Sequence, residues 1–465
     1  MNPVPQPAPG PCCSSSSISS TPTRREFLAR GATFAAASAL AGVALPPVHA
    51  AGDDTIQLAL IGCGGRGSGA VANALEASGG PVKLVAMADL FENRLASAHQ
   101  ALSRQFGARI DVPRDRQFIG FDAYQQAIAC LRPGSGDIAM LTGYAGFRPA
   151  QLEHAVERGV HVFMEKSFAT DPPGVRRIIA AGEAAERKGL KIAAGLMCRH
   201  SRNRQELIRR IREGELGEIL MIRAYRMEPS GPLGPKPPGT GDLEWQIRNF
   251  TKFLWVSGGL YAEMDIHQID EICWIKDACP VAAHGVGGRV AGSTDCSQNL
   301  DSFSAEWTFA DGTKGYDVVR YIPGCHDEFA TYIHGTKRAA QFSGNIHAAT
   351  VRTYKDQRIA RDNLAWEAPK EEITAWQAQW NDLLNAVRLN QPFNQAKRAA
   401  LSNLTDIMGR AAIHMGKVIT WDEAMASEFR FCPDIDHLTY DSPPPIRADA
   451  EGRYPVPVPG KWVEI

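Results

Sequence analysis

The feature that most constrains this chain is a glycine-rich turn between an apolar run and a helical pattern. In TIQLALIGCGGRGSGAVANALE, the residues Gly62, Gly64 and Gly67 form the spacing G-x-G-x-x-G. The first glycine permits a tight turn, the second lets the backbone approach a pyrophosphate, and the third lets the helix pack on the strand. The N-terminus of the helix then faces the phosphate charge. This stretch predicts a dinucleotide-binding strand-turn-helix whose turn includes Gly65 and Arg66.

A second apolar run, VKLVAMAD, ends at Asp89, about twenty residues after the turn. A carboxylate at the end of this second strand accepts hydrogen bonds from the ribose hydroxyls of an adenosine group. It also repels a 2′-phosphate. Asp89 therefore favours NAD as the cofactor, while the nearby cation of Arg94 leaves NADP open.

Strands and helices alternate regularly in the first part of the chain. Further strand-like runs occupy residues 137–142, 161–164 and 191–196, with helical stretches between them. Regular alternation implies right-handed crossovers and a parallel sheet, which binds its ligand beyond the carboxyl ends of the strands. We therefore predict an α/β fold with a Rossmann NAD-binding domain over residues 51–200.

The remainder of the chain has a different pattern. Strand-like runs follow one another from about residue 219, and the helical patterns near 373–388 and 397–415 come after them. Strands in succession flanked by helices predict an α+β domain with an open, mainly antiparallel sheet. We place this substrate and oligomerisation domain at residues 201–425 and treat residues 426–465 as a C-terminal extension.

Residues 1–50 are interpreted as a Tat-type signal and leader. A Pro- and Ser-rich stretch is followed by Arg24 and Arg25, a moderately apolar run and the small-residue exit VHA, which ends at Ala50. This order of charged, apolar and cleavable regions is typical of a secretory signal with twin arginines; the alternative is an amphipathic helix with a chance arginine pair. The Tat export machinery is thus an expected partner, and a periplasmic or secreted location is expected.

Composition excludes several classes of function. Lys and Arg number 50 against 51 for Asp and Glu, so the chain lacks the basic field that nucleic acid or an anionic membrane requires. No run of eighteen apolar residues follows the N-terminal region, so no membrane span is expected in the mature form. The ten cysteines form no C-x-x-C pattern, and neither a metal site nor a dense disulfide framework is indicated.

Polar residues follow the predicted strands at the edge where the cofactor should lie. Thr142 ends the fourth strand, and Glu165 and Lys166 end the fifth. A lysine there can donate a hydrogen bond to an alcohol or carbonyl oxygen, and burial beside a cofactor can shift its pKa toward proton transfer. The alternative is an ordinary surface lysine. We also expect Tyr144 and the pair Arg199 and His200 to reach substrate hydroxyls from nearby strand ends.

The sequence SGGLYAEMDIHQIDEICWI predicts a helix after two glycines. Glu263 and His267 stand four residues apart and share a face, with Asp270 about one turn further. A carboxylate that orients an imidazole beside a substrate hydroxyl is a general-base arrangement. An ordinary ion pair on a helix face is the alternative interpretation. Asp265 should point elsewhere.

Three motifs in this order resemble the Gfo/Idh/MocA oxidoreductases: the turn GCGGRG, the dipeptide Glu165–Lys166, and the GG…E…H helix. The segment CRHSRNRQELIRRIREGELGEI is similar to that family's crossover between domains, so the resemblance runs from about Thr55 to Glu423. It implies proton transfer by Lys166 and His267, hydride transfer to nicotinamide, and a supporting role for Glu263.

The sequence departs from the family pattern at three positions. Ser167 stands where a proline is usual, Asp265 where a glycine is usual, and Gly143 where a proline is usual. Glu263 also replaces the usual aspartate, so its carboxylate reaches one methylene further. The missing proline after Lys166 removes a backbone restraint but no catalytic group.

The interpretation that follows is an exported NAD-dependent oxidoreductase that acts on a sugar, glycoside or polyol hydroxyl with tightly bound cofactor. Lys166, His267 and Glu263 are its expected catalytic residues, and Tyr144, Arg199, His200 and Asp270 its expected substrate residues. One alternative is an NAD-dependent glycosidase that works by transient oxidation, elimination and hydrolysis. Another is a non-catalytic sugar or dinucleotide sensor. The resemblance also implies a homo-oligomer.

Overall fold

A computed structural model describes residues 54–344 and 350–465 of the chain. The predicted signal and leader, residues 1–50, lie outside the described residues. Residues Ala51–Ile465 form one compact unit, which contains two sheets. Within the described residues, no helix is both long and apolar enough to span a membrane.

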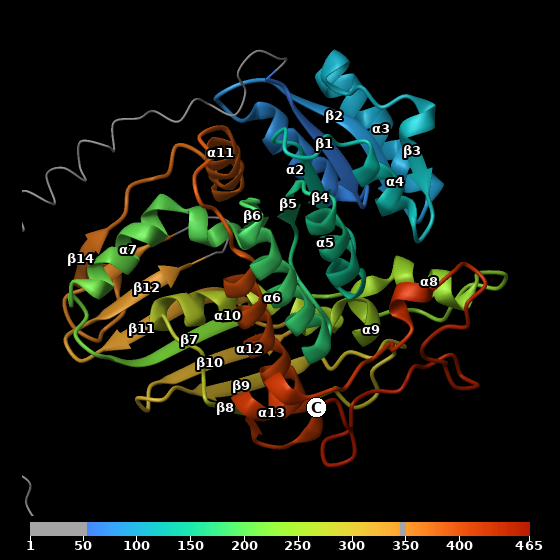
Figure 1. Ribbon diagram of the computed structural model, residues 1–465. Helices are drawn as coiled ribbons and strands as arrows, with labels where there is room; N and C mark the ends of the chain where they lie inside the picture. The colour runs from blue at the N-terminus through green and yellow to red at the C-terminus, as the bar shows by residue number, and fades with distance from the viewer. Residues whose placement is uncertain (1–53, 345–349) are drawn as a thin grey trace, which may run out of the picture. The chain divides into compact units, whose positions relative to one another are not determined.

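The first sheet is fully parallel, with the strand order β3-β2-β1-β4-β5-β6 (Figure 1). This is the doubly wound order, with its switch point between β1 and β4, so the prediction of a parallel-sheet Rossmann fold is confirmed. The strands are β1 Ile56–Ile61, β2 Val82–Asp89, β3 Gln117–Ile119, β4 Ile138–Leu141, β5 His161–Met164 and β6 Ile192–Ala194. The connecting helices are α2 Gly65–Glu76, α3 Glu92–Phe106, α4 Ala123–Ala129, α5 Arg148–Glu157 and α6 Pro172–Arg187.

The second sheet has the order β14-β13-β12-β11-β7-β10-β9-β8-β15. Only the β7–β10 pairing is parallel, so the prediction of an open, mainly antiparallel sheet is confirmed. The strands are β7 Ile219–Met227, β8 Ala282–Gly288, β9 Ser302–Thr308, β10 Lys314–Arg320, β11 Glu328–Gly335, β12 Ala339–Ser343, β13 Arg352–Tyr354, β14 Leu364–Glu367 and β15 Ile419–Thr420.

Helices cover one face of this second sheet. Burial alternates along β9 and β10, which is typical of strands with one packed and one partly solvated face. α10 (Gly259–Lys276) packs on β7 and β10, and α12 (Ala396–Met415) packs on β8 and β9 and against α6 and α10. The shorter helices are α7 Arg202–Arg212, α8 Asp242–Arg248, α9 Leu254–Ser257 and α13 Trp421–Ala426.

One helix from late in the chain packs on the first sheet. α11 (Ala375–Arg388) falls inside the predicted second domain, yet it packs against α2 and β6 of the first sheet (Figure 1). Its Trp380 and Leu383 are fully buried in the same apolar cluster as β1 and β2. Parallel sheets need cover on both faces, so a helix from late in the chain completes the first layer.

The C-terminal extension, residues 426–465, contacts the segment after β2 and helix α12. The Tyr440 hydroxyl donates to the carbonyl oxygen of Leu90, just after β2, at 2.6 Å. At the other end Glu464 is fully buried and accepts hydrogen bonds from Arg410 and His414 of α12, each at 2.8 Å. The extension is therefore part of the packed molecule.

Candidate active site

A cavity of about 820 Å³ opens where the carboxyl ends of β1, β2, β4 and β5 meet the start of α10. This is the edge at which open parallel sheets bind ligands. Its lining contains all the residues predicted to hold the cofactor: Gly62, Gly64, Gly65, Arg66, Gly67, Asp89, Thr142, Glu165 and Lys166. Tyr144, Phe250 and Glu263 line it as well.

The glycine turn forms the floor of this cavity. Gly62 adopts φ +96°, a conformation that other residues rarely take. A Cβ atom on Gly67 would lie 2.3 Å from the Gly62 carbonyl oxygen and 2.7 Å from Thr142 Oγ1. That threonine hydroxyl donates to the carbonyl oxygens of Ile61 (3.0 Å) and Gly62 (2.7 Å), so the two strand ends are tied together. The packing here requires glycine.

The same turn leaves room on its other side. A Cβ atom built on Gly64 or Gly65 would meet no atom within 4 Å, although both residues line the cavity. α2 begins at Gly65, so the positive end of its dipole faces this space. Open space above a helix N-terminus fits a pyrophosphate group.

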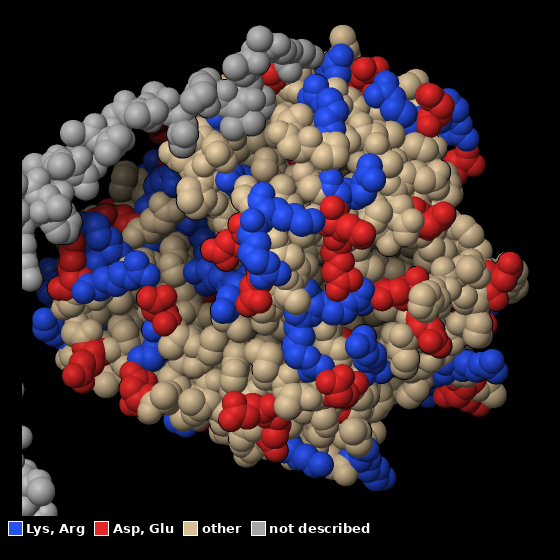
Figure 2. Space-filling view, viewed as in Figure 1, with Lys and Arg blue, Asp and Glu red and all other residues tan. Residues whose placement is uncertain are grey.

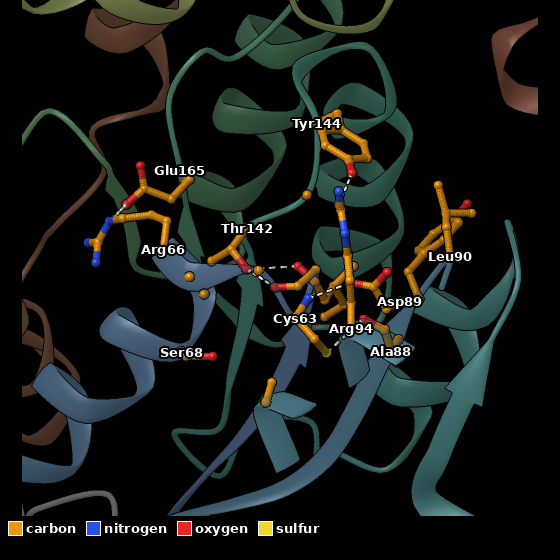
Figure 3. Close-up of a pocket in the computed structure, with 18 of the residues that line it drawn as sticks. Cys63, Arg66, Ser68, Ala88, Asp89, Leu90, Arg94, Thr142, Tyr144 and Glu165 are labelled. Atoms are coloured by element: carbon orange, nitrogen blue, oxygen red, sulfur yellow. Dashed lines mark hydrogen bonds and ion pairs between the residues drawn. The ribbon is translucent and has the colours of Figure 1, made fainter. Parts of the chain in front are cut away.

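Asp89 lies at one end of the cavity, beside the turn (Figure 3). Its carboxylate accepts backbone N–H bonds from Cys63 at 2.6 Å and Phe91 at 2.9 Å. Burial raises the pKa of Asp89, while these bonds and the charge of Arg94 act in the opposite direction. A carboxylate has about four acceptor positions, so Asp89 can still accept bonds from a ribose diol.

Arg94 and Tyr144 face each other above Asp89 (Figure 3). Arg94 donates a hydrogen bond to the Tyr144 hydroxyl and lies 5.1 Å from the centre of the Phe91 ring. Burial raises the pKa of Tyr144 to about 12. Tyr144 also packs against Phe250, with ring centroids 4.9 Å apart. The tyrosine predicted to bind substrate is thus placed beside Asp89, at the end of the cavity that fits the adenosine.

Arg66 and Glu165 form an ion pair on the opposite wall, with Nε to Oε1 at 2.6 Å (Figure 3). Arg66 Nη2 is buried, and no described residue bonds to it. An unpaired guanidinium nitrogen next to a space that fits a pyrophosphate is what an anionic ligand would satisfy. The set of residues at this end of the cavity therefore fits a dinucleotide.

Lys166, just after β5, contacts Glu263 near the start of α10. Lys166 Nζ lies 2.9 Å from Glu263 Oε2 and also donates to the backbone carbonyl of Glu263. The Lys166–Ser167 peptide bond is cis, and the Ser167 hydroxyl donates to the carbonyl of Ala262 at 2.7 Å. The end of β5 is thus joined to the first turns of α10, and both charged groups line the cavity.

His267 lies one turn beyond Glu263 on α10 and is partly buried. It is not among the described residues that line the cavity. We expected Glu263 to support His267. The Glu263 carboxylate forms an ion pair with Lys166, and the roles of Glu263 and His267 in proton transfer stay predictions. Asp265 points elsewhere, as expected, because its carboxylate accepts a hydrogen bond from Tyr321.

Three predicted substrate residues lie away from this cavity. Arg199 forms a two-pronged ion pair with Asp270, at 2.8 Å from Nε to Oδ2. His200 is buried and bonds through Nδ1 to Asp382 at 2.7 Å. Of the described residues that line the cavity, none is Arg199, His200 or Asp270. Arg199 and His200 lie in the short turn Met197–His200 (η4) after β6, and their side chains reach α10 and α11. Asp270 lies on α10, where it binds Arg199.

Two residues that we did not predict fix the segment around Lys166. The buried Arg148, at the start of α5, donates to the carbonyls of Leu141, Gly143 and Ser167, so it joins the ends of β4 and β5. Asn403 of α12 accepts the backbone N–H groups that follow Ser167. A charged residue at a helix start and an amide in a helix carry no sequence signal for such contacts.

The second sheet has a recognised family match. Residues 205–341 match the GFO/IDH/MocA C-terminal domain. This range runs from within α7 into β12 and lies inside the predicted second domain. A search among curated proteins found no match to the chain.

Solved structures of similar fold include several sugar and polyol oxidoreductases. One is scyllo-inositol dehydrogenase from Lactobacillus casei with bound NAD(H) and scyllo-inositol: 20% identity, TM-score 0.58, 79% of this chain and 99% of that chain covered. Another is aldose-aldose oxidoreductase from Caulobacter crescentus complexed with glycerol: 17% identity, TM-score 0.60, with 79% and 99% covered. A third is myo-inositol 2-dehydrogenase from Lactobacillus plantarum: 18% identity, TM-score 0.58, with 79% and 99% covered. At these identities the likeness establishes the shared fold.

Proposed function

We propose that this protein is an NAD-dependent oxidoreductase that oxidises a secondary alcohol of a sugar or polyol. One observation carries the proposal: a single cavity has the glycine turn and Asp89 at one end and the Lys166–Glu263 pair at the other. The first end fits the adenosine and pyrophosphate of a dinucleotide, and the second offers a cation and a carboxylate to a hydroxyl group. The sugar and polyol dehydrogenases of the same fold support this substrate class.

Lys166 and Glu263 have different roles toward the substrate hydroxyl. An ammonium has three N–H donors, and Lys166 directs two of them at Glu263, which leaves one for the substrate oxygen. That bond stabilises the negative charge that develops on the oxygen as the C–H bond breaks. The Glu263 carboxylate accepts the hydroxyl proton as general base. When NAD is bound, it supplies the acceptor for the hydride, so the alcohol becomes a ketone.

We propose further that the protein is exported with NAD tightly bound. The support is the order of twin arginines, apolar run and small-residue exit within residues 23–50. A protein outside the cytoplasm has no pool of free NAD(H) to draw on, so its cofactor must travel with it. Mass spectrometry of small molecules released from protein purified from the periplasm or culture medium tests this part: NAD should be recovered in about equal molar amount.

The activity itself is tested with purified protein, NAD and a panel of inositols, aldoses and glycerol. We expect the near-ultraviolet absorbance of NADH to appear with at least one of them. Lys166→Ala should lower kcat by about 10²-fold or more while the Kd for NAD changes little, because the loss of one donor to a developing oxyanion costs about this much. His267→Ala measured in parallel shows whether the imidazole contributes as well.

Two outcomes would contradict the proposal. If NAD binds but no sugar or polyol changes its absorbance, the protein is a sensor. If a glycoside is cleaved with no net formation of NADH, the protein is an NAD-dependent glycosidase. Undiminished activity in the Lys166→Ala variant would refute the role assigned to that residue.

A further inference from the structure

A second cavity, of about 500 Å³, lies outside the proposed active site. Residues of η4, α7, the C-terminal half of α10 and the start of α12 line it. Its lining contains four arginines, Arg199, Arg209, Arg212 and Arg398. Figure 2 shows Lys and Arg side chains gathered around a hollow beside α7.

The two arginines of α7 have acidic partners of their own. Arg209 forms ion pairs with Glu206 at 2.7 Å and with Glu213. Arg212 lies 3.4 Å from Asp277, and both side chains are exposed. Charge at the rim of the cavity is therefore largely balanced by neighbouring carboxylates.

The floor of the cavity is different, because two guanidinium groups share one carboxylate. Asp270 is buried and binds Arg199 through both oxygens, and its Oδ1 also accepts from the Ser402 hydroxyl at 2.7 Å. Arg398 Nη1 lies 3.7 Å from Oδ1, beyond hydrogen-bond distance. No described residue bonds to this buried nitrogen.

One positive charge at this floor is therefore left without compensation. Burial, and then the charge of Arg199, lower the pKa of Arg398 to about 9, still well above neutral pH. A buried guanidinium nitrogen without a partner is costly unless a ligand supplies the acceptor. An oxyanion would supply both the acceptor and the negative charge.

We propose that this cavity binds a small organic oxyanion, a carboxylate or a phosphate monoester, through Arg398 and Arg199. The volume admits more than an inorganic ion, and the wall also contains Trp274, whose ring lies 5.1 Å from the Arg199 guanidinium, and Ile208. A planar guanidinium presents paired donors that match both oxyanions. An anionic sugar would place its charge on the arginines and its ring against this apolar wall.

The site is linked to the proposed active site through α10. Glu263 lines the cofactor cavity, and Asp270 lies seven residues later on the same helix, about 10 Å along its axis. The oxyanion site does not depend on the oxidoreductase proposal, since its residues are separate from the cofactor cavity. Binding there can be tested whether or not the protein turns over sugars.

The test is calorimetric titration of the full chain at constant ionic strength. Inorganic phosphate and glucuronate are the two probes, and NAD is present in excess because the glycine turn is itself expected to bind phosphate. We expect one oxyanion per chain. Arg398→Gln should weaken oxyanion binding at least tenfold, and Arg398→Lys should weaken it less. Arg104→Gln removes an exposed arginine on α3 and should leave the affinity unchanged. The probe that binds more tightly distinguishes phosphate from carboxylate ligands.

Thermal unfolding separates a binding role from a structural one. An oxyanion should raise the Tm of the wild type but not that of Arg398→Gln, and without ligand the variant should be at least as stable as the wild type, because an uncompensated charge has been removed. Equal affinity of both proteins for the probes, or no binding by the wild type, would overturn the proposal. If Arg398→Gln fails to fold, Arg398→Lys provides the comparison of affinities, with Arg104→Gln as its control.

Discussion

Gly67 and Gly69 lie two residues apart on α2, yet a methyl group would meet different surroundings at each. At Gly67 it would overlap the Gly62 carbonyl and the Thr142 hydroxyl, whereas at Gly69 the nearest atom is the end of the Arg66 side chain at 3.5 Å. The close approach of strand and helix therefore depends on one of these glycines only.

Substitution by alanine should separate the two positions. Gly67→Ala should cost about 1–3 kcal/mol of stability through overpacking and should weaken NAD binding at least tenfold, because the turn must open. Gly69→Ala serves as the matched control and should stabilise the protein by about 0.5–1 kcal/mol, since alanine is the better helix former. Chemical denaturation and NAD titration measure both effects. Equal behaviour of the two variants would contradict this account of the turn.

Asp89 should set the choice between the two dinucleotides. Its carboxylate repels a 2′-phosphate, and the nearby cation of Arg94 would attract one once that carboxylate is gone. Asp89→Ala should therefore weaken NAD binding and tighten NADP binding, so that the ratio of their Kd values shifts by about tenfold or more. The double variant Asp89→Ala/Arg94→Gln should lose the tighter NADP binding expected for Asp89→Ala alone. An unchanged ratio in Asp89→Ala would show that Asp89 does not face the ribose.

At the scale of helices and strands, the sequence predicted those elements whose pattern is local. The strand at 161–164 matches β5, and the predicted helix at 397–415 begins one residue late compared with α12. The three-residue β3 and two-residue β15 were missed because so short a run has no readable periodicity. The packing of α11 on the first sheet was missed because it depends on the assembled fold.

In the candidate site, too, residues marked by a local pattern could be predicted, whereas contacts that depend on the assembled fold could not. The glycines, Asp89 and Lys166 could be predicted because each lies at the end of a recognisable strand, where a parallel sheet places its ligand. The contact from Asn403 to Phe168 joins residues 235 positions apart, and no spacing in the sequence indicates it. Arg199 and His200 also follow a strand, but a turn redirects them, which the sequence does not reveal.

α12 should influence catalysis through Asn403. Its side-chain oxygen accepts the backbone N–H groups of Phe168 and Ala169, at 3.0 and 2.7 Å, and so fixes the chain just after Lys166. Asn403→Ala leaves two buried donors unpaired, at about 1–3 kcal/mol each, and should lower kcat while the Kd for NAD stays within about twofold. Asn403→Asp keeps the acceptor, so kcat should recover even though the buried charge reduces stability. A purely structural role would lower stability in both variants without this difference in kcat.

At the scale of the whole molecule, the C-terminal extension and both sheets meet at Arg410. This buried side chain donates to the Thr170 carbonyl beyond β5, at 2.9 Å, and to the Gly258 carbonyl just before α10. Glu464, near the end of the chain, accepts from its Nε. The carboxylate therefore completes a contact that joins the Rossmann part, the start of α10 and the extension.

This contact should appear in the pH dependence of stability. Burial opposes ionisation of Glu464, but the charges of Arg410 and His414 outweigh it and lower its pKa to about 2, from an ordinary value of 4.5. A depressed carboxyl pKa contributes stability above the unfolded-state value, and this contribution disappears as pH falls from about 5 toward 2. At neutral pH it amounts to about 3 kcal/mol, so Glu464→Gln should lose that much at pH 7 and progressively less as the pH approaches 3. Denaturant unfolding at several pH values measures the difference, with the exposed Glu451→Gln as the control that should match the wild type throughout. A loss in Glu464→Gln that is the same at pH 7 and pH 3 would show that packing of the extension, not the charge of Glu464, joins these three segments.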